Sequence, residues 1–184
     1  MIVVGLGNPG ERYRETRHNA GFMFVERLRD YLEREDHIAS QWETEDLFSA
    51  QIAKCEYMSI PLVLLKPQLF MNRSGEVVAK YLDKKEIKDI EKELILVHDD
   101  LDIKMGEYKI QFGISPRGHN GVNDVESKIG SINYRRVRIG VDDRIDRLMP
   151  PDEYVLQRLD QETLSALTEA VDKAILELIA QLQE

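Results

Sequence analysis

The sequence predicts one α/β domain, because three of its features agree on that fold class. The chain has 184 residues, of which 42% are hydrophobic, and this is enough for one sizeable core but not for two. Short strand-like runs alternate along the chain with segments of helical periodicity. No internal repeat or low-complexity stretch interrupts the alternation, so we expect a single domain over residues 1–184.

The first half of the chain is predicted to form a strand, a loop, a helix, a hairpin and a second helix. Residues 1–6 form a short apolar run that is typical of a buried strand. An amphipathic helix is expected over residues 20–35, where Phe24, Leu28 and Leu32 are spaced four apart. Residues 45–57 and 60–66 are then predicted to form the two strands of a hairpin, and residues 74–84 are predicted to form a helix.

The second half continues the alternation. Strands are predicted over residues 93–98, 106–112 and 136–141, a short helix over 121–129, and a closing amphipathic helix over 164–182. Residues 142–152 carry Pro150, Pro151 and charges of alternating sign, so we expect a linker that acts as a mobile flap.

The net charge of −9 argues against a nucleic-acid partner, because phosphates favour clustered lysine and arginine. The charge is unevenly distributed, however. Residues 101–140 hold seven basic residues against four acidic ones, whereas residues 141–184 hold four against eleven. A basic middle segment followed by an acidic end permits a local anion site.

The chain carries no signal for a membrane or for secretion. No run reaches the roughly 18 apolar residues that a membrane helix needs, and the apolar run at residues 1–6 has no basic leader. We therefore expect a cytoplasmic protein. The single cysteine, Cys55, has no partner for a disulfide or a zinc cluster, and we expect it to be a packed strand residue.

A glycine-rich motif follows the first strand, at residues 5–10, and it matches the fingerprint of dinucleotide-binding sites. That fingerprint needs a helix to start at its last glycine, so that amides face a pyrophosphate. Here Pro9 lacks an amide hydrogen, helical spacing begins only at Ala20, and the expected acid, Asp30, falls inside the helix. We therefore expect a structural turn with the Asn8 amide at its tip and no bound dinucleotide.

The loop that precedes the first helix contains His18, where a general base over a cleft would be placed. A histidine at a helix start is also typical of a cap or of a solvated surface group. Further polar residues stand at the ends of other predicted strands. Because ligands of α/β sheets lie outside the carboxyl ends of the strands, these residues can converge on one crevice: Phe70, Met71 and Asn72, then His98, Asp99, Asp100 and Asp102, and His119 with Asn120.

Each of these groups has a simpler interpretation. Asn72 and Asn120 could cap helices, and Phe70 and Met71 could belong to the core. The aspartates could chelate a hard cation, but acid-rich loops are usually just solvated. The histidines also lack the i, i+4 spacing of a zinc helix, so we expect neither a metal nor another cofactor.

Taken together, these runs resemble bacterial-type peptidyl-tRNA hydrolases, in order along nearly the whole chain. The matching segments are 4–10, Tyr13 with 16–21, Lys66-Pro67 with 70–72 and 74–75, 98–102, 118–121 and 136–140. The resemblance implies a mixed, twisted sheet between helices. It also implies that the chain hydrolyses the ester between a peptide and the 3′ end of tRNA, with peptidyl-tRNA as its partner, and that it works as a monomer.

Position by position, the resemblance assigns roles to individual residues. His18 matches the base that takes a proton from water, Asp99 the carboxylate that holds the imidazole in its basic tautomer, and Asn8 the residue that helps to distinguish blocked from free aminoacyl-tRNA. The resemblance also implies that a groove for the peptide and the 3′ end of tRNA is lined by Tyr13, Phe70, Met71, Asn72, His119 and Asn120.

The chain departs from the family pattern at two places that concern tRNA binding. Residues 112–117 replace a glycine-rich run, and Pro116 stiffens that loop. The lysine of the family's phosphate clamp falls on Gln111, with Lys109 two residues away on the same strand face and Arg138 as the other half of the clamp. Two alternatives remain: a non-catalytic RNA-binding relative on the same fold, and a hydrolase of another ester or amide.

Overall fold

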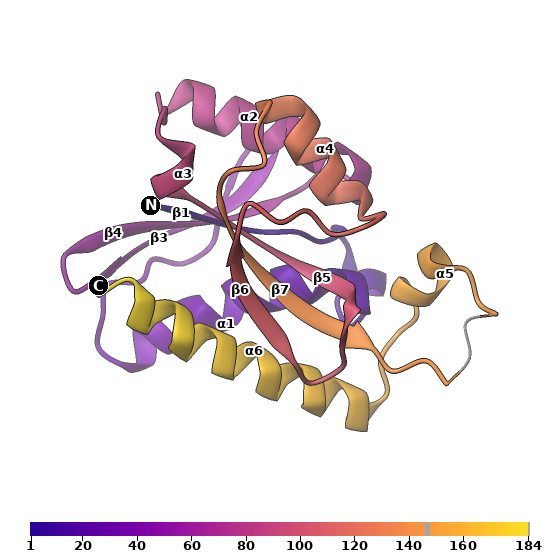
Figure 1. Cartoon of the computed structure of the whole chain (residues 1–184). Coiled ribbons are helices and arrows are strands. Elements are labelled where there is room, and N and C mark those ends of the chain that lie inside the picture. Colours follow the sequence, from indigo (N-terminus) through magenta and orange to yellow (C-terminus); the bar gives the residue numbers. More distant parts are fainter. Residues whose placement is uncertain (146–147, 184) are drawn as a thin grey trace.

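A seven-stranded mixed sheet forms the centre of the molecule (Figure 1). The computed structural model describes residues 1–145 and 148–183. The strands lie in the order β2-β3-β4-β1-β5-β7-β6, with β4, β1, β5 and β7 parallel to one another and β2, β3 and β6 antiparallel to their neighbours. Their bounds are β1 Ile2–Gly5, β2 Glu43–Glu45, β3 Ala50–Tyr57, β4 Ile60–Pro67, β5 Leu94–Lys104, β6 Tyr108–Phe112 and β7 Arg135–Asp142. The α/β class and the mixed sheet are thus confirmed.

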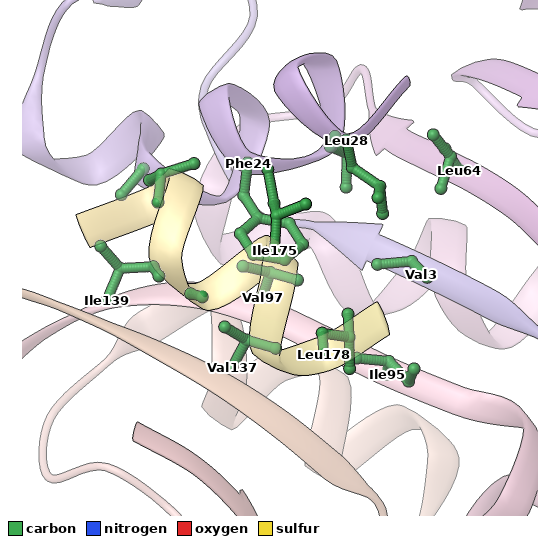
Figure 2. Packing of buried hydrophobic residues seen from close by; sticks show 14 of the residues in the cluster. Val3, Phe24, Leu28, Leu64, Ile95, Val97, Val137, Ile139, Ile175 and Leu178 are labelled. Carbon is green, nitrogen blue, oxygen red and sulfur yellow. The ribbon is translucent and has the colours of Figure 1, made fainter. Parts of the chain in front are cut away.

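Helices cover both faces of the sheet and separate two hydrophobic clusters. Helices α1 (Ala20–Arg34) and α6 (Gln161–Gln181) pack on one face, and α2 (Ser74–Lys84) and α4 (Asn120–Ile129) pack on the other. Figure 2 shows the first cluster, in which Phe24 and Leu28 of α1 meet Ile175 and Leu178 of α6 above Val97 of β5. The smaller elements are α3 (Ile90–Glu93), α5 (Pro151–Val155) and the 3-10 turns η1 (Glu11–Tyr13), η2 (Arg17–Asn19) and η3 (Met71–Arg73).

The strand β1 and the first four residues of β5 (94–97) are buried on both faces, which explains their unbroken apolar sequences. Two glycines allow α1 to start directly against the end of β1. A Cβ on Gly5 would lie 2.2 Å from the carbonyl oxygen of Gly21, and a Cβ on Gly21 would lie 2.4 Å from the amide nitrogen of Leu6. Gly5 of the glycine-rich motif therefore permits close packing. No helix begins at Gly10, because the turns η1 and η2 come before α1.

Three segments differ from the sequence prediction. The run predicted as one strand over 45–57 is two strands, β2 and β3, because the turn between them places Ser49 at a φ of 53°. Strand β5 continues to Lys104, six residues beyond the predicted end, since it keeps pairing with β7. The predicted flap contains the first residues of α5, while its residues 146 and 147 lie outside the described part of the chain.

Other predicted features are found where expected. Cys55 is buried in β3, and burial raises the pKa of its thiol to about 11, so it is an unreactive core residue. Within residues 1–145 and 148–183, none of the helices has both the length and the apolar character needed to cross a bilayer.

Candidate active site

The polar segments predicted to converge do meet, where β1 and β4 end beside the middle of β5. A cleft of about 380 Å³ opens there, and we call it the catalytic cleft. The start of α1 approaches it from one face of the sheet and the start of α4 from the other. Among the residues that line it are Asn8, His18, Phe70, Met71, Asn72, Asp99, His119 and Asn120.

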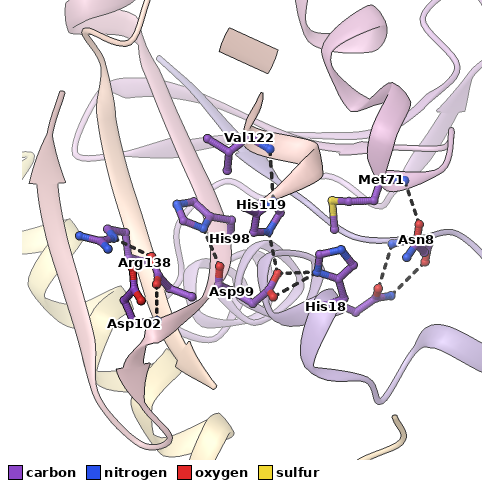
Figure 3. Close-up of polar contacts among 11 residues, drawn as sticks. Asn8, His18, Met71, His98, Asp99, Asp102, His119, Val122 and Arg138 are labelled. Atoms are coloured by element: carbon purple, nitrogen blue, oxygen red, sulfur yellow. Dashed lines mark hydrogen bonds and ion pairs between the residues drawn. The ribbon is translucent and has the colours of Figure 1, made fainter. Parts of the chain in front are cut away.

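The centre of the cleft is a pair formed by His18 and Asp99 (Figure 3). His18 lies in η2, and its Nδ1 is 2.9 Å and 3.1 Å from the two carboxylate oxygens of Asp99 on β5. Since the carboxylate can only accept, Nδ1 carries the hydrogen and Nε2 keeps a free lone pair. Burial alone would lower the pKa of His18, but the charge of Asp99 and this hydrogen bond outweigh burial, so the pKa is raised. His18 is thus arranged as a base.

A second imidazole, that of His119, binds the same carboxylate. Its Nε2 lies 2.9 Å from Oδ1 of Asp99, and its Nδ1 accepts a hydrogen bond of 3.2 Å from the amide of Val122. His119 is therefore the N-cap of α4, and capping fixes the tautomer in which Nε2 donates to Asp99. Burial would raise the pKa of Asp99, but the two imidazoles outweigh it and hold the pKa well below its usual range. Asp99 stays ionised.

His98, to which the sequence analysis assigns no role of its own, supports Asp99 and His119 through direct contacts. Its Nδ1 donates to the carbonyl oxygen of Asp99 over 2.7 Å, and its ring lies edge-on to His119 with centroids 5.1 Å apart. The residue is completely buried, and burial, followed by repulsion from His119, lowers its pKa to about 3. His98 is a neutral packing and hydrogen-bonding group at every physiological pH.

Asn8 is held at the rim by a network that includes Asn19, which the sequence analysis did not single out. The Asn19 side chain accepts from the amide of Asn8 (2.9 Å) and donates to its carbonyl (3.0 Å). The side-chain oxygen of Asn8 accepts from the amide of Met71 over 2.8 Å (Figure 3). With that oxygen occupied, the NH₂ group of Asn8 remains as a donor.

The two other asparagines are not helix caps. Asn72 lies in η3 and the N-cap of α2 is Arg73, while Asn120 follows His119, which is the cap of α4. Both side chains are exposed at the cleft.

Phe70, Met71 and Tyr13 form the apolar side of this region. Met71 is a core residue, whereas Phe70 is 54% exposed. Tyr13 stands edge-on to Phe70 with ring centroids 6.3 Å apart, so it extends this apolar rim without lining the cleft itself.

The ligand atoms of His18, Asp99 and His119 lie within 4.8 Å of one another, which is close enough to hold a metal ion. Metal ligation needs an unprotonated ring nitrogen, however, and both nitrogens that face Asp99 carry hydrogens in the arrangement above. In particular, the Val122 amide would oppose any proton moved to Nδ1 of His119. The geometry fits a carboxylate shared by two neutral donors better than a metal site.

Arg138 is largely buried and already bonded to two side chains, and its role as a phosphate contact stays a prediction. The residue is 8% exposed, its Nε donates to Asp100 over 2.8 Å, and its Nη1 donates to the side chain of Gln111 over 2.6 Å. Lys109 faces Arg138 across the β6–β7 pair and is exposed, and Arg117 is exposed at the cleft. Lys109 and Arg117 are therefore the cations available on this side.

Comparison with known proteins adds an independent finding. The family model described as peptidyl-tRNA hydrolase matches residues 2–184. The chain belongs to this family. A peptidyl-tRNA hydrolase of Neisseria meningitidis serogroup C is 38% identical over 178 residues, which cover 95% of this chain and 86% of the relative. That of Thermodesulfovibrio yellowstonii is 31% identical over 189 residues, covering 100% and 93%.

Solved structures of the peptidyl-tRNA hydrolase family have the same fold. The crystal structure of peptidyl-tRNA hydrolase from Acinetobacter baumannii superimposes with a TM-score of 0.85 at 32% identity, covering 99% of this chain and 89% of that one. A second match, a peptidyl-tRNA hydrolase in complex with N-propanol, has a TM-score of 0.85 at 30% identity and covers 99% and 88%.

In this peptidyl-tRNA hydrolase family member, a wall of the cleft comes from α5, which the sequence analysis missed. The wall residues are Pro151, Asp152, Val155 and Leu156. Arg17, next to His18, stacks its guanidinium 4.1 Å from the ring centroid of Tyr154 and donates to Asp143 over 2.8 Å. The Tyr154 hydroxyl also contacts Asp143 and donates to the carbonyl of Val141. Five residues are too few for a clear helical period, which explains why the sequence does not predict α5, whose first two residues fall at the end of the expected linker.

Proposed function

We propose that the protein hydrolyses the ester between a peptide and the 3′ end of tRNA, with His18 as general base and water as nucleophile. The observation that carries this proposal is the His18–Asp99 pair, which faces the cleft with a free Nε2. No serine, threonine or cysteine is among the described residues that line the cleft, so this pair has no side-chain nucleophile to activate there.

The reaction follows from the positions of these groups. Nε2 of His18 takes a proton from water while the water oxygen bonds to the ester carbonyl carbon. The resulting imidazolium is stabilised by Asp99, which stays ionised as its pKa is low. When the tetrahedral intermediate collapses, the bond from carbon to the ribose oxygen breaks. That oxygen takes the proton from Nε2, and the base is restored.

Side-chain amides supply the donors for the oxyanion. Asn72 and Asn120 are exposed at the cleft, and Asn8 offers its NH₂ group because its oxygen is occupied. Such neutral donors stabilise developing negative charge without adding a charge to the ground state. For the tRNA, the exposed Lys109 and Arg117 are the candidate phosphate contacts, in place of the buried Arg138.

Cleavage of an N-blocked aminoacyl-tRNA, compared with an N-acyl amino-acid ester without RNA, tests the proposal. We expect the tRNA substrate to be cleaved with a much higher kcat/KM. Binding of tRNA without cleavage would indicate the non-catalytic RNA-binding relative, and equal cleavage of both would indicate a hydrolase of other esters or amides. A monomer in the cytoplasm that acts without a dinucleotide stays a prediction.

A further inference from the structure

The segment between β6 and α4 forms one wall of the catalytic cleft, and we call residues 113–118 the β6–α4 loop (Figure 1). Its glycines stand only at the two ends, Gly113 and Gly118, with positive φ angles of 65° and 73°. Between them, Pro116 is buried, while Arg117 is exposed and lines the cleft. The chain can therefore turn at both ends of the loop, whereas the proline ring restricts its middle.

A contact with α4 fixes the middle of this loop. The hydroxyl of Ser115 donates to Oε1 of Glu126 over 2.5 Å, and the same oxygen accepts from Nη2 of Arg136 over 2.6 Å. Because the acceptor is a carboxylate that also forms an ion pair with an arginine, the bond from the serine is of the stronger, charge-assisted kind. Ser115 is itself exposed, so this contact holds a surface loop to a helix.

Arg136 holds the carboxylate of Glu126 in a fixed position. Its side chain is completely buried on β7, and its guanidinium lies 4.2 Å from the ring centroid of Tyr134. Nε and Nη1 of Arg136 have no hydrogen-bond partner among the described residues, so the ion pair with Glu126 compensates this buried charge. Separating such a pair would leave an uncompensated charge in the interior, which is strongly unfavourable. Glu126 therefore presents a fixed acceptor to the loop.

The anchored loop carries a cation of the catalytic cleft. Arg117 follows Ser115 by two residues and has no carboxylate partner within residues 1–145 and 148–183. A long side chain on an unanchored loop occupies many positions. Its apparent affinity for a phosphate is then reduced by the fraction of time that it spends in the competent position. An anchor two residues away removes part of this loss before the tRNA binds.

We propose that Glu126 is a positioning residue for tRNA binding, which acts through Ser115 to hold Arg117 at the catalytic cleft. This proposal rests on the proposed function, in which Arg117 is a candidate phosphate contact. Neither Glu126 nor Ser115 lines the cleft, so both act through the loop and not on the reacting ester. Where a glycine-rich run would leave the loop free to move, this chain has a loop that is preorganised for its substrate.

Removal of the serine hydroxyl tests the anchor. Ser115→Ala should raise KM for an N-blocked aminoacyl-tRNA about fivefold and leave kcat unchanged, as the loss of one hydrogen bond would give. Cleavage of an N-blocked aminoacyl-adenosine, which has no phosphate, should not change. Ser115→Thr keeps a hydroxyl and should retain the wild-type KM. The matched control is Ser127→Ala, which removes an exposed hydroxyl one residue after Glu126 on α4.

Double variants show whether Ser115 acts through Arg117 and Glu126. Once Arg117→Ala has removed the cation, the further change Ser115→Ala should raise KM hardly at all. Glu126→Leu combined with Arg136→Met removes both charges of the ion pair together, which avoids leaving a buried arginine unpaired. This double variant should raise KM as much as Ser115→Ala does.

Trypsin provides a measurement that needs no tRNA. The protease cleaves after arginine, and the bond between Arg117 and Gly118 joins two exposed residues of the loop. Cleavage of a native protein follows the population of the locally open form. This bond should therefore be cut about fivefold faster in Ser115→Ala than in the wild type or in Ser127→Ala, since one hydrogen bond is lost.

Three results would overturn the proposal. The first is trypsin cleavage after Arg117 at the same rate in the wild type and in Ser115→Ala. The second is an equal loss of Ser115→Ala on the tRNA and adenosine substrates, and the third is independent, multiplicative losses when Ser115→Ala is combined with Arg117→Ala. Failure of the proposed function would instead show in the wild type, which would not cleave the tRNA substrate, and the trypsin measurement would still test the anchor.

Discussion

Asp99 and Asp100 are neighbours on β5, yet their side chains have opposite surroundings. Asp99 faces two imidazoles, His18 and His119, each 2.9 Å from its Oδ1. Asp100 points to the other face of the sheet, where its Oδ2 accepts from Nε of Arg138 over 2.8 Å. Both carboxylates are almost completely buried. The two carboxylates therefore differ in their hydrogen-bonding partners and not in their degree of burial.

This difference determines what each carboxylate can do. An arginine is permanently charged, so its ion pair with Asp100 does not depend on a proton taken up during a reaction and contributes to structure. An imidazole gains its charge only when it takes a proton, so in the proposed mechanism Asp99 has its strongest interaction with His18 during the reaction. The proposal thus assigns a catalytic role to the buried carboxylate whose partner can titrate near neutral pH.

Removing His18, the partner of Asp99 that can titrate, should have the largest effect and is the strongest test of the difference between Asp99 and Asp100. His18→Ala should lower turnover by roughly 10²–10⁴-fold, because the general base is lost, while tRNA affinity changes little. Asp99→Asn acts through the same imidazole, so the double variant should be hardly slower than His18→Ala alone. Single-turnover cleavage and equilibrium tRNA binding would measure the two effects. Independent, multiplicative losses would show that Asp99 has a role separate from His18.

Breaking the other pair should affect stability instead. Arg138→Met leaves Asp100 buried without its charged partner, and such a loss typically costs about 3–5 kcal/mol in the free energy of unfolding. The double variant Arg138→Met, Asp100→Leu should recover most of this, because both buried charges are then gone. Urea denaturation would measure the free energy of unfolding of both variants. If Arg138→Met kept full stability and lost only tRNA affinity, Arg138 would contact phosphate, as the sequence had suggested.

The fold and the residues that line the cleft could be predicted from the sequence because their signals are local. Strand β1 is an unbroken apolar run, α1 has regular four-residue spacing, and His18 belongs to a short motif. The partner of Arg138 was not predictable in this way. Asp100 lies 38 residues away, and only the parallel pairing of β5 with β7 brings the two side chains to one face.

The same limitation explains the other omissions. The β2-β3-β4 meander brings the Trp42 ring against the Lys66 ammonium, and no local pattern in either segment indicates this contact. Asn19 was overlooked beside His18 because its role depends on the backbone of Asn8. Residues whose function rests on contacts between distant segments need the structure.

A smaller effect is expected in the pH dependence of kcat/KM. The charge of Asp99 raises the pKa of His18 above its ordinary 6.5, so kcat/KM should increase with pH through a midpoint above that value. Asp99→Asn removes the charge and should move the midpoint to lower pH. The same shift stabilises the fold fully below pH 6.5, and this contribution fades as pH rises through the folded-state pKa. A midpoint unchanged by Asp99→Asn would mean that another group controls the rate.

The smallest expected effect concerns Lys109, the exposed neighbour of the Asp100–Arg138 pair across β6 and β7. Since Arg138 is neutralised, Lys109 is the free cation of this strand face in the described part of the chain. If it contacts one phosphate of duplex RNA, Lys109→Ala should reduce the slope of log affinity against log salt by about 0.9. Cleavage of a short N-blocked nucleotide ester should not change.

The matched control is Lys173→Ala, which removes an exposed lysine on α6 and should leave the slope as it is. A slope that Lys109→Ala does not alter would place the tRNA phosphates away from this face, and Arg117 would then be the remaining cation at the catalytic cleft to test.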